Sequence, residues 1–207
     1  MNLKLVIYHS ILDGIFSDEY KPNQILNEKE LVEKYGCSKS PVRDALITLC
    51  NEGILRSIPR YGYEVIRLTR ETVEQVLQYR FILESGYLRL SYERITPEQI
   101  EQLRQTDLLC NQPEDGIFEH WDKNQEFHLK LISLSGNSYA VQELKRSMDL
   151  LKRAYAQFYW DKWEQTSIPS DIKCHKEIIS CLESKDIEQA IHYLQTDLDD
   201  FGMCKKQ

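Results

Sequence analysis

The stretch SKSPVRDALITLCNEG, residues 38–53, has the composition of one short helix together with its start and stop signals. Ser38 suits an N-cap because its hydroxyl can accept a backbone N–H that has no partner inside the helix. Pro41 is tolerated in the first turn, and Gly53 favours termination. At about 100° per residue, one face collects the apolar side chains and is predicted to be buried: Val42, Ala45, Leu46 and Leu49.

The opposite face of this helix carries cationic and hydroxyl groups close to its N-terminus. Lys39, Ser40 and Arg43 lie there beside the backbone amides that open the helix. Side-chain charge and helix dipole both favour an anion at this position. A DNA phosphate or the edge of a guanine fits these donors, so the pattern indicates a DNA-reading helix.

The residues before this helix predict two further helices. Apolar residues at helical spacing follow Leu3, and a second helix is predicted after Asn27, whose side chain suits an N-cap. A short turn at Gly36 then leads into residues 38–53. Two helices joined by a tight turn that contains glycine, the second with a basic N-terminus, are typical of a helix-turn-helix.

The residues after this helix predict a β-hairpin, or wing. Strand-like runs at 54–58 and 63–67 flank a turn that contains Arg60, Tyr61 and Gly62. Arg60 and Tyr61 are expected to reach a minor groove or the flanking phosphates, and Gly62 would permit a close backbone approach. DNA binding is therefore favoured over the alternative, a winged helix that binds protein as an adaptor.

Composition places the chain among ordinary globular proteins. Its 207 residues, 42% hydrophobic and 29% charged, allow one large or two small domains. No apolar run approaches the roughly 20 residues that span a bilayer, and the first residues do not resemble a signal peptide. The six cysteines form no CxxC pair, which argues against a zinc ribbon or a disulfide framework. We therefore expect a cytoplasmic protein with no membrane partner.

The net charge of −7 is unevenly distributed. Residues 1–67 hold nine Lys or Arg and nine Asp or Glu, so the whole negative charge lies in the remainder of the chain. A neutral N-terminal module with clustered cations can bind DNA, whereas the acidic remainder is expected to have a different role.

From Thr69 onward the pattern predicts helices only. The fold class expected is mainly α, with a winged helix-turn-helix domain at 1–68 and an all-helical bundle at 69–207. About six helices are predicted in the bundle, at 70–93, 97–111, 116–134, 138–163, 171–184 and 187–203.

Polar residues interrupt the apolar faces of four of these helices. They are Arg80 and Glu84 on the first, Asn124 and His128 on the third, His175 on the fifth, and Asp197 on the last. One interpretation is an Arg80–Glu84 ion pair with hydrogen-bonded core histidines. The other is a metal or ligand pocket of the kind that helical bundles build from facing helices, with imidazole and carboxylate donors that suit zinc or nickel.

The N-terminal residues resemble the winged helix-turn-helix of the GntR family of bacterial transcription regulators. The resemblance covers residues 5–67 and depends on Gly14, Leu26, Leu31, the run from Ser38 to Leu46, Glu52-Gly53 and Gly62. It implies DNA contacts at Lys29, Lys39, Ser40, Arg43 and the wing tip near Tyr61 and Gly62. The family usually has Arg where this chain has Lys39, which keeps the charge but weakens bidentate base reading.

The C-terminal residues resemble the FCD ligand-binding domain of the FadR-type subgroup. Phe127-His128, Ser135-Gly136-Asn137, His175 and the segment from Asp186 to Ala190 carry this resemblance. It implies a metal site at His128, His175, Asp197 and Asn124, although the family typically has Asp at position 124 and His at position 197. It also implies a small organic acid as effector, bound at the open positions of the metal and by Arg80.

These inferences combine into a dimeric, ligand-responsive transcription regulator. A homodimer would present two winged helices to half-sites of a double-stranded DNA operator about 34 Å apart or at another whole-turn spacing. A small carboxylate metabolite in the bundle would change operator occupancy. A metal-dependent enzyme is the competing interpretation, but it needs a general base, and the inward positions offer only Glu84.

Overall fold

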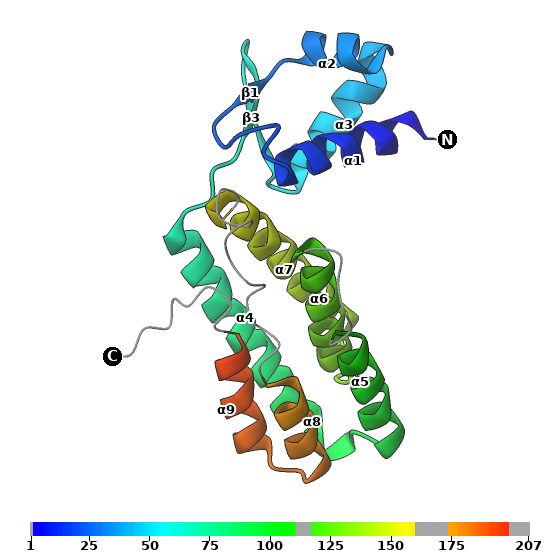
Figure 1. The fold of residues 1–207 in the computed structure, drawn as a ribbon, viewed down its shortest axis with the longest axis vertical. Helices are drawn as coiled ribbons and strands as arrows, with labels where there is room; N and C mark the ends of the chain where they lie inside the picture. The colour runs from blue at the N-terminus through cyan, green and yellow to red at the C-terminus, as the bar shows by residue number, and fades with distance from the viewer. Residues whose placement is uncertain (1, 111–116, 160–173, 199–207) are drawn as a thin grey trace. The chain divides into compact units, whose positions relative to one another are not determined.

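In a computed structural model that describes residues 2–110, 117–159 and 174–198, the N-terminal part is a three-helix unit with a small sheet (Figure 1). Its elements are α1 (Leu3–Phe16), β1 (Ile25–Leu26), α2 (Glu28–Tyr35), α3 (Lys39–Asn51), β2 (Leu55–Ile58) and β3 (Gly62–Val65). The predicted helix-turn-helix and wing are therefore both present.

Helix α3 buries the face that its periodicity predicts. Its fully buried side chains are Val42, Ala45, Leu46 and Leu49, and they pack with Ile7, Ile11 and Ile15 of α1. Ser38 takes the extended backbone of an N-cap, but its side chain makes no capping hydrogen bond, contrary to the expectation for its hydroxyl. Asn27 does cap α2, because its side chain accepts from the Lys29 N–H at 2.9 Å.

The wing belongs to a three-stranded antiparallel sheet with the order β1-β3-β2. Strand β3 pairs with both neighbours, with Leu26 opposite Tyr63 and Arg56 opposite Glu64. The two-residue strand β1 is too short to produce an alternating pattern and was not predicted. Gly62 has φ +137°, and a Cβ at this position would lie 2.4 Å from the Leu26 carbonyl oxygen, so glycine is required by the sheet itself.

The second part of the chain is helical, as predicted. It contains α4 (Arg70–Ser91), a 3-10 turn (Tyr92–Arg94), α5 (Pro97–Cys110), α6 (Ile117–Ser133), α7 (Ser138–Tyr159), α8 (His175–Glu183) and α9 (Ile187–Asp197). The predicted ends at 111, 116, 160–163, 171–173 and 199–203 lie outside the described residues. By spatial grouping, one unit holds the chain up to Thr69 with the end of α7 from Arg153, and the other begins at Arg70.

The core of the helical unit is assembled from five helices that are far apart in the sequence. Leu88, Leu103, Phe127, Ile178 and Leu194 are buried in one cluster, one from each of α4, α5, α6, α8 and α9. Among the described residues, no helix has both the length and the apolar character needed to cross a membrane.

Candidate functional site

The six polar residues predicted to face inward are all buried in the helical unit. Each exposes 1% of its surface or less. Arg80 and Glu84 lie on α4, Asn124 and His128 lie one turn apart on α6, His175 begins α8, and Asp197 ends α9. Buried charges and imidazoles are costly unless they are paired or bind a ligand, so this set indicates a functional site.

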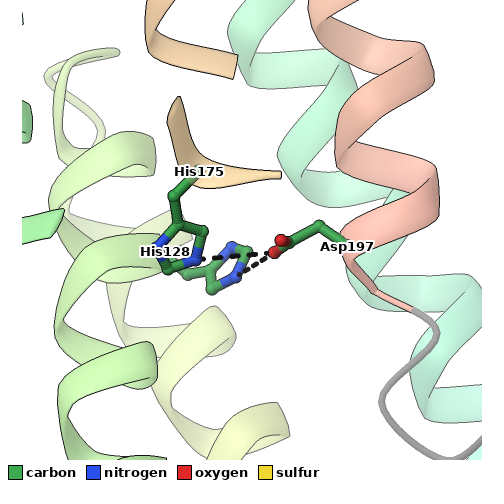
Figure 2. Close-up of side chains that lie close together, drawn as sticks. All are labelled: His128, His175 and Asp197. Atoms are coloured by element: carbon green, nitrogen blue, oxygen red, sulfur yellow. Dashed lines mark ion pairs between the residues drawn. The ribbon is translucent and has the colours of Figure 1, made fainter. Parts of the chain in front are cut away.

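Three donor atoms meet at the centre of this set. Asp197 Oδ2 lies 3.1 Å from His128 Nε2 and 3.5 Å from His175 Nε2 (Figure 2). One donor atom from each residue lies within 4.8 Å of the other two. Within the described parts of the chain, none of these three atoms has a partner in hydrogen-bond geometry. Two imidazole nitrogens and a carboxylate oxygen in one small space fit a divalent metal ion such as zinc or nickel.

Local structure places Asp197 and His175 against each other. The Asp186 side chain caps α9 by accepting from the Gln189 N–H at 3.1 Å, which agrees with the predicted start of this helix at residue 187. At the far end of α9, Asp197 Oδ1 accepts from the backbone N–H of Cys174 at 2.9 Å, just before α8 begins. This bond ties the two helices together and leaves Oδ2 facing both imidazoles.

A second layer of carboxylates orients the two histidines. His128 Nδ1 lies 2.7 Å from Glu84 Oε2, and His175 Nδ1 lies 3.3 Å from Asp107 Oδ1. The hydrogen bond of His128 and the ion-pair contact of His175 both engage Nδ1, so Nε2 of each ring is the nitrogen that faces Asp197. Phe127 stacks on the His175 ring with centroids 3.5 Å apart and fixes its plane.

Sequence reasoning missed Asp107 and gave Glu84 too small a role. Asp107 lies on the buried face of α5 between Leu103 and Cys110. Its position inside an apolar stripe was a usable signal of the same kind that identified the other inward residues. Glu84 was expected to pair with Arg80, and Arg80 Nε does donate to Glu84 Oε1 at 2.6 Å. The other oxygen of Glu84 bonds His128, so the carboxylate joins the ion pair to the donor cluster.

The electrostatics of the cluster favour a positive charge at its centre. Burial lowers the pKa of His175, but its close contacts with Asp107, Asp197 and Cys110 outweigh burial and raise that pKa to about 11. Burial also raises the pKa of Asp197, yet the two imidazoles hold it well below its ordinary range. Burial also raises the pKa of Glu84, but His128 and Arg80 outweigh burial and lower that pKa. In the absence of metal, a proton on His175 supplies the positive charge.

Asn124 is buried without satisfied hydrogen bonds. Both its amide oxygen and its amide nitrogen lack a partner among the described residues. Leaving a buried amide unsatisfied costs about 1–3 kcal/mol per group. Asn124 lies one turn before His128 on α6, so its unsatisfied amide is on the face of the helix that carries the donor cluster.

A separate hollow lies on the outside of the helical unit. Its volume is about 580 Å³, and it runs between α5 and α6. Its lining includes Gln105, Thr106, Gln125, Glu126 and Leu129, and none of the donor-cluster residues contributes to it. This surface groove is therefore distinct from the buried polar site.

The predicted DNA contacts all lie in the N-terminal unit, and most of them are exposed. Lys39, Ser40 and Arg43 are exposed along the first turns of α3. Lys29 projects from α2 with 83% of its side chain accessible. Gly62 is only partly exposed, whereas Arg60 and Tyr61 are exposed at the turn between β2 and β3, where Arg60 has φ +72°.

Two acidic residues that sequence reasoning did not consider lie on the same unit. Glu28 accepts from Arg43 Nε at 3.1 Å and from Arg43 Nη2 at 3.0 Å. Glu64 pairs with Arg56 across the wing, with its Oε2 2.5 Å from Arg56 Nη2. Arg43 is thus held by a carboxylate from the preceding helix.

Comparison with known proteins assigns a family model to each part of the chain. The model for bacterial regulatory proteins of the gntR family matches residues 3–65, and the FCD domain model matches residues 75–200.

Similar proteins and structures agree with these matches. An uncharacterised HTH-type transcriptional regulator of Bacillus subtilis (strain 168), YdhC, is 30% identical over 152 residues, which cover 71% of this chain and 67% of that protein. The Nta operon transcriptional regulator of Aminobacter aminovorans is 28% identical over 162 residues, covering 77% of this chain and 74% of that protein. The solved structure of E. coli McbR/YncC has the same fold, with a TM-score of 0.71, 21% identity, and coverage of 96% and 94% of the two chains.

Proposed function

We propose, from the premise that this chain belongs to the gntR family of bacterial regulatory proteins and carries an FCD domain, that a small organic acid bound in the helical unit controls its affinity for an operator. The protein is a ligand-responsive, DNA-binding transcription regulator, and regulators of this family bind DNA operators and generally act as dimers. They are generally not enzymes. Residues 1–68 would bind DNA, and residues 69–207 would bind the effector and form the dimer.

The convergence of His128, His175 and Asp197 carries this proposal. These residues would hold a divalent ion, zinc or nickel, which supplies a positive centre with open positions for a carboxylate. Glu84 and Asp107 support the two imidazoles from behind, at 2.7 Å and 3.3 Å. Such outer partners fix ligand orientation and raise metal affinity.

Asn124 and Arg80 are proposed to act in different ways at this site. Asn124 would contact the effector or the metal, which is supported by its two unsatisfied amide atoms. Its N–H₂ group can donate to a carboxylate oxygen, whereas an Asp at this position would repel one. Arg80 donates to Glu84 at 2.6 Å. That bond favours the ion-pair interpretation, so Arg80 would fix the carboxylate that orients His128.

The bond network also argues against the enzyme interpretation. A hydrolytic metal site needs a general base near the open coordination positions. Glu84 was the candidate, and both of its oxygens are engaged, one by Arg80 and one by His128. A binding site that senses a small acid needs no such base.

The DNA contacts proposed are Lys29, Lys39, Ser40, Arg43, Arg60, Tyr61 and Gly62. The exposure of the cations on α2 and α3 and at the wing tip supports them. For Gly62 the support is weaker, because the close approach that it permits is to the Leu26 carbonyl of its own sheet.

A stripe on α4 is the proposed dimer surface. Ile82 and Leu90 are each 70% exposed and Tyr79 is 44% exposed, although all three are large and apolar. Gly86 lies between them, and a Cβ there would meet no atom within 4 Å. Exposed apolar patches of this kind mark interaction surfaces, and a second copy of the chain would cover this one.

We expect Ile82→Glu to give a monomer by sedimentation, whereas Leu108→Glu, at a 56% exposed leucine on α5, should leave the dimer intact. A dimer in both variants would exclude the α4 stripe.

The effector proposal is tested with an operator selected by the purified protein from a random duplex library. Affinity for this duplex is measured by fluorescence anisotropy with zinc or nickel, while small mono-, di- and tricarboxylic acids are added in turn. At least one acid should change the affinity by about 5- to 150-fold, the usual range of allosteric coupling. The same acid should have no effect on Asp197→Asn. If no acid changes operator affinity in the metal-loaded protein, the proposal fails.

A further inference from the structure

The ion pair between Glu28 and Arg43 joins the two helices of the helix-turn-helix at the surface proposed to meet DNA. Glu28 is the first residue of α2, and Arg43 lies in the second turn of α3. The two guanidinium bonds have lengths of 3.1 Å and 3.0 Å and reach different carboxylate oxygens. The Glu28 side chain is 22% exposed and the Arg43 side chain is 57% exposed, so the pair lies at the surface with the guanidinium outermost.

The way in which Arg43 is held determines which of its donors stay available. A guanidinium has five N–H groups: one on Nε and two on each terminal nitrogen. Glu28 takes the Nε edge, using Nε–H and one N–H of Nη2. The opposite edge, which contains both N–H groups of Nη1 and the second N–H of Nη2, is not used by Glu28. Two parallel donors on that edge match O6 and N7 of guanine in the major groove.

The same carboxylate has a second effect, on DNA that offers no matching base. Arginine side chains are flexible, and an arginine without a carboxylate partner can turn to the nearest phosphate. Glu28 holds the guanidinium in one orientation and adds a negative charge that phosphates repel. Both effects weaken binding to any duplex through its backbone while leaving the base-reading edge in place. Specificity is the difference between the affinity for the operator and the affinity for other duplexes. A group that lowers the affinity for other duplexes therefore increases specificity.

We propose that Glu28 is a positioning residue for operator specificity, which fixes Arg43 so that its end-on edge reads a base and which disfavours non-specific duplex. This inference rests on the proposed DNA-binding role of Arg43 and adds a residue that no family resemblance or sequence pattern singled out. The contact depends on where α2 lies against α3, because 15 residues separate the two side chains.

The test compares Glu28→Gln with the full-length parent protein on two duplexes of equal length, the selected operator and a scrambled sequence. Glutamine keeps the shape but has only one acceptor oxygen and no charge. We expect it to bind the scrambled duplex about 3- to 10-fold more tightly and to reduce the ratio of specific to non-specific affinity by at least about 10-fold. The loss of discrimination should be concentrated at one base pair per half-site when single-substitution operators are compared.

Two further variants separate positioning from charge. Glu28→Asp keeps the charge but retracts the carboxylate by one methylene, so it should lose discrimination without gaining non-specific affinity. Glu30→Gln removes the same charge from an exposed position in the first turn of α2 and serves as the matched control. Glu30→Gln should change the affinities for the operator and for the scrambled duplex by the same factor, less than about twofold. Circular dichroism of each variant checks that the helices are intact.

The outcomes distinguish this inference from the proposed function. If Arg43→Ala binds the operator as tightly as the parent protein, the DNA contact itself is wrong. If Arg43→Ala weakens binding but Glu28→Gln keeps the specificity ratio within twofold, the positioning role of Glu28 is overturned. If Glu28→Gln weakens binding to the operator and to the scrambled duplex equally, Glu28 has a purely structural role, and the positioning role is again overturned. In the Arg43→Ala background, Glu28→Gln should no longer alter base discrimination.

Discussion

Replacing Asp197 by Asn should remove most of the stabilisation of this protein by a divalent metal while leaving its fold intact. Asn keeps an oxygen for the Cys174 N–H, which Asp197 Oδ1 accepts at 2.9 Å. Its N–H₂ group would replace Oδ2 between His128 Nε2 and His175 Nε2, at 3.1 Å and 3.5 Å. The amide has nearly the same shape as the carboxylate, so the change removes a charged oxygen without creating a cavity. An amide nitrogen does not bind a metal ion, so one of the three donors is lost.

The size of the effect follows from binding linkage. Metal present at 100 times its dissociation constant stabilises the folded protein by about 2.7 kcal/mol. For a chain of this size each kcal/mol shifts the melting temperature by about 2–4 °C, so the parent protein should gain about 5–11 °C. If loss of the carboxylate weakens binding at least about 100-fold, the same metal concentration adds about 0.4 kcal/mol or less. The shift then falls to about 1–2 °C.

The measurement is a thermal melt of chelator-treated protein with and without zinc or nickel. His192→Gln is the matched control, because His192 is an exposed histidine on the same helix, five residues before Asp197. It should keep the full shift. The donor-cluster interpretation is refuted if metal leaves the parent protein's melting temperature unchanged, or if Asp197→Asn retains the shift.

Two more predictions concern pH and the wing. The pKa of His175 is raised from its ordinary 6.5 to about 11, so its contribution to stability is complete below pH 6.5 and is lost as pH rises toward 11. Urea unfolding of the metal-free protein should therefore give a lower free energy of unfolding at pH 9 than at pH 7, and His175→Gln should lose most of this difference; a flat profile in the parent would contradict the assignment. Gly62→Ala should destabilise the N-terminal unit by about 2 kcal/mol or more, because its Cβ would lie 2.4 Å from the Leu26 oxygen at a positive φ. Hydrogen exchange of the β3 amides measures this effect, and unchanged protection would exclude it.

Local periodicity was enough to predict the elements and their inward faces. Val42 and Leu46 face the core of the N-terminal unit, and His128 and His175 face the core of the helical unit, as the helical period requires. Turn and cap residues such as Asn27 and Asp186 gave helix starts correctly, because capping is a contact between residues two or three positions apart. The identity of the inward polar residues was therefore available from the sequence.

Tertiary structure alone decided which side chains meet. The helical period gives the face of the helix on which Asp107 or Glu84 lies. The side chain that each carboxylate contacts depends on which helix packs against that face and at which position along its axis. Asp107 reaches a histidine 68 positions away along the chain, and Glu28 reaches an arginine 15 positions away. The two-residue strand β1 likewise depends on distant contacts, namely its pairing with β3 and the burial of Leu26 in the core. The sequence therefore determined the elements and their inward residues, whereas the packing of distant elements determined the bonds that make these residues a site.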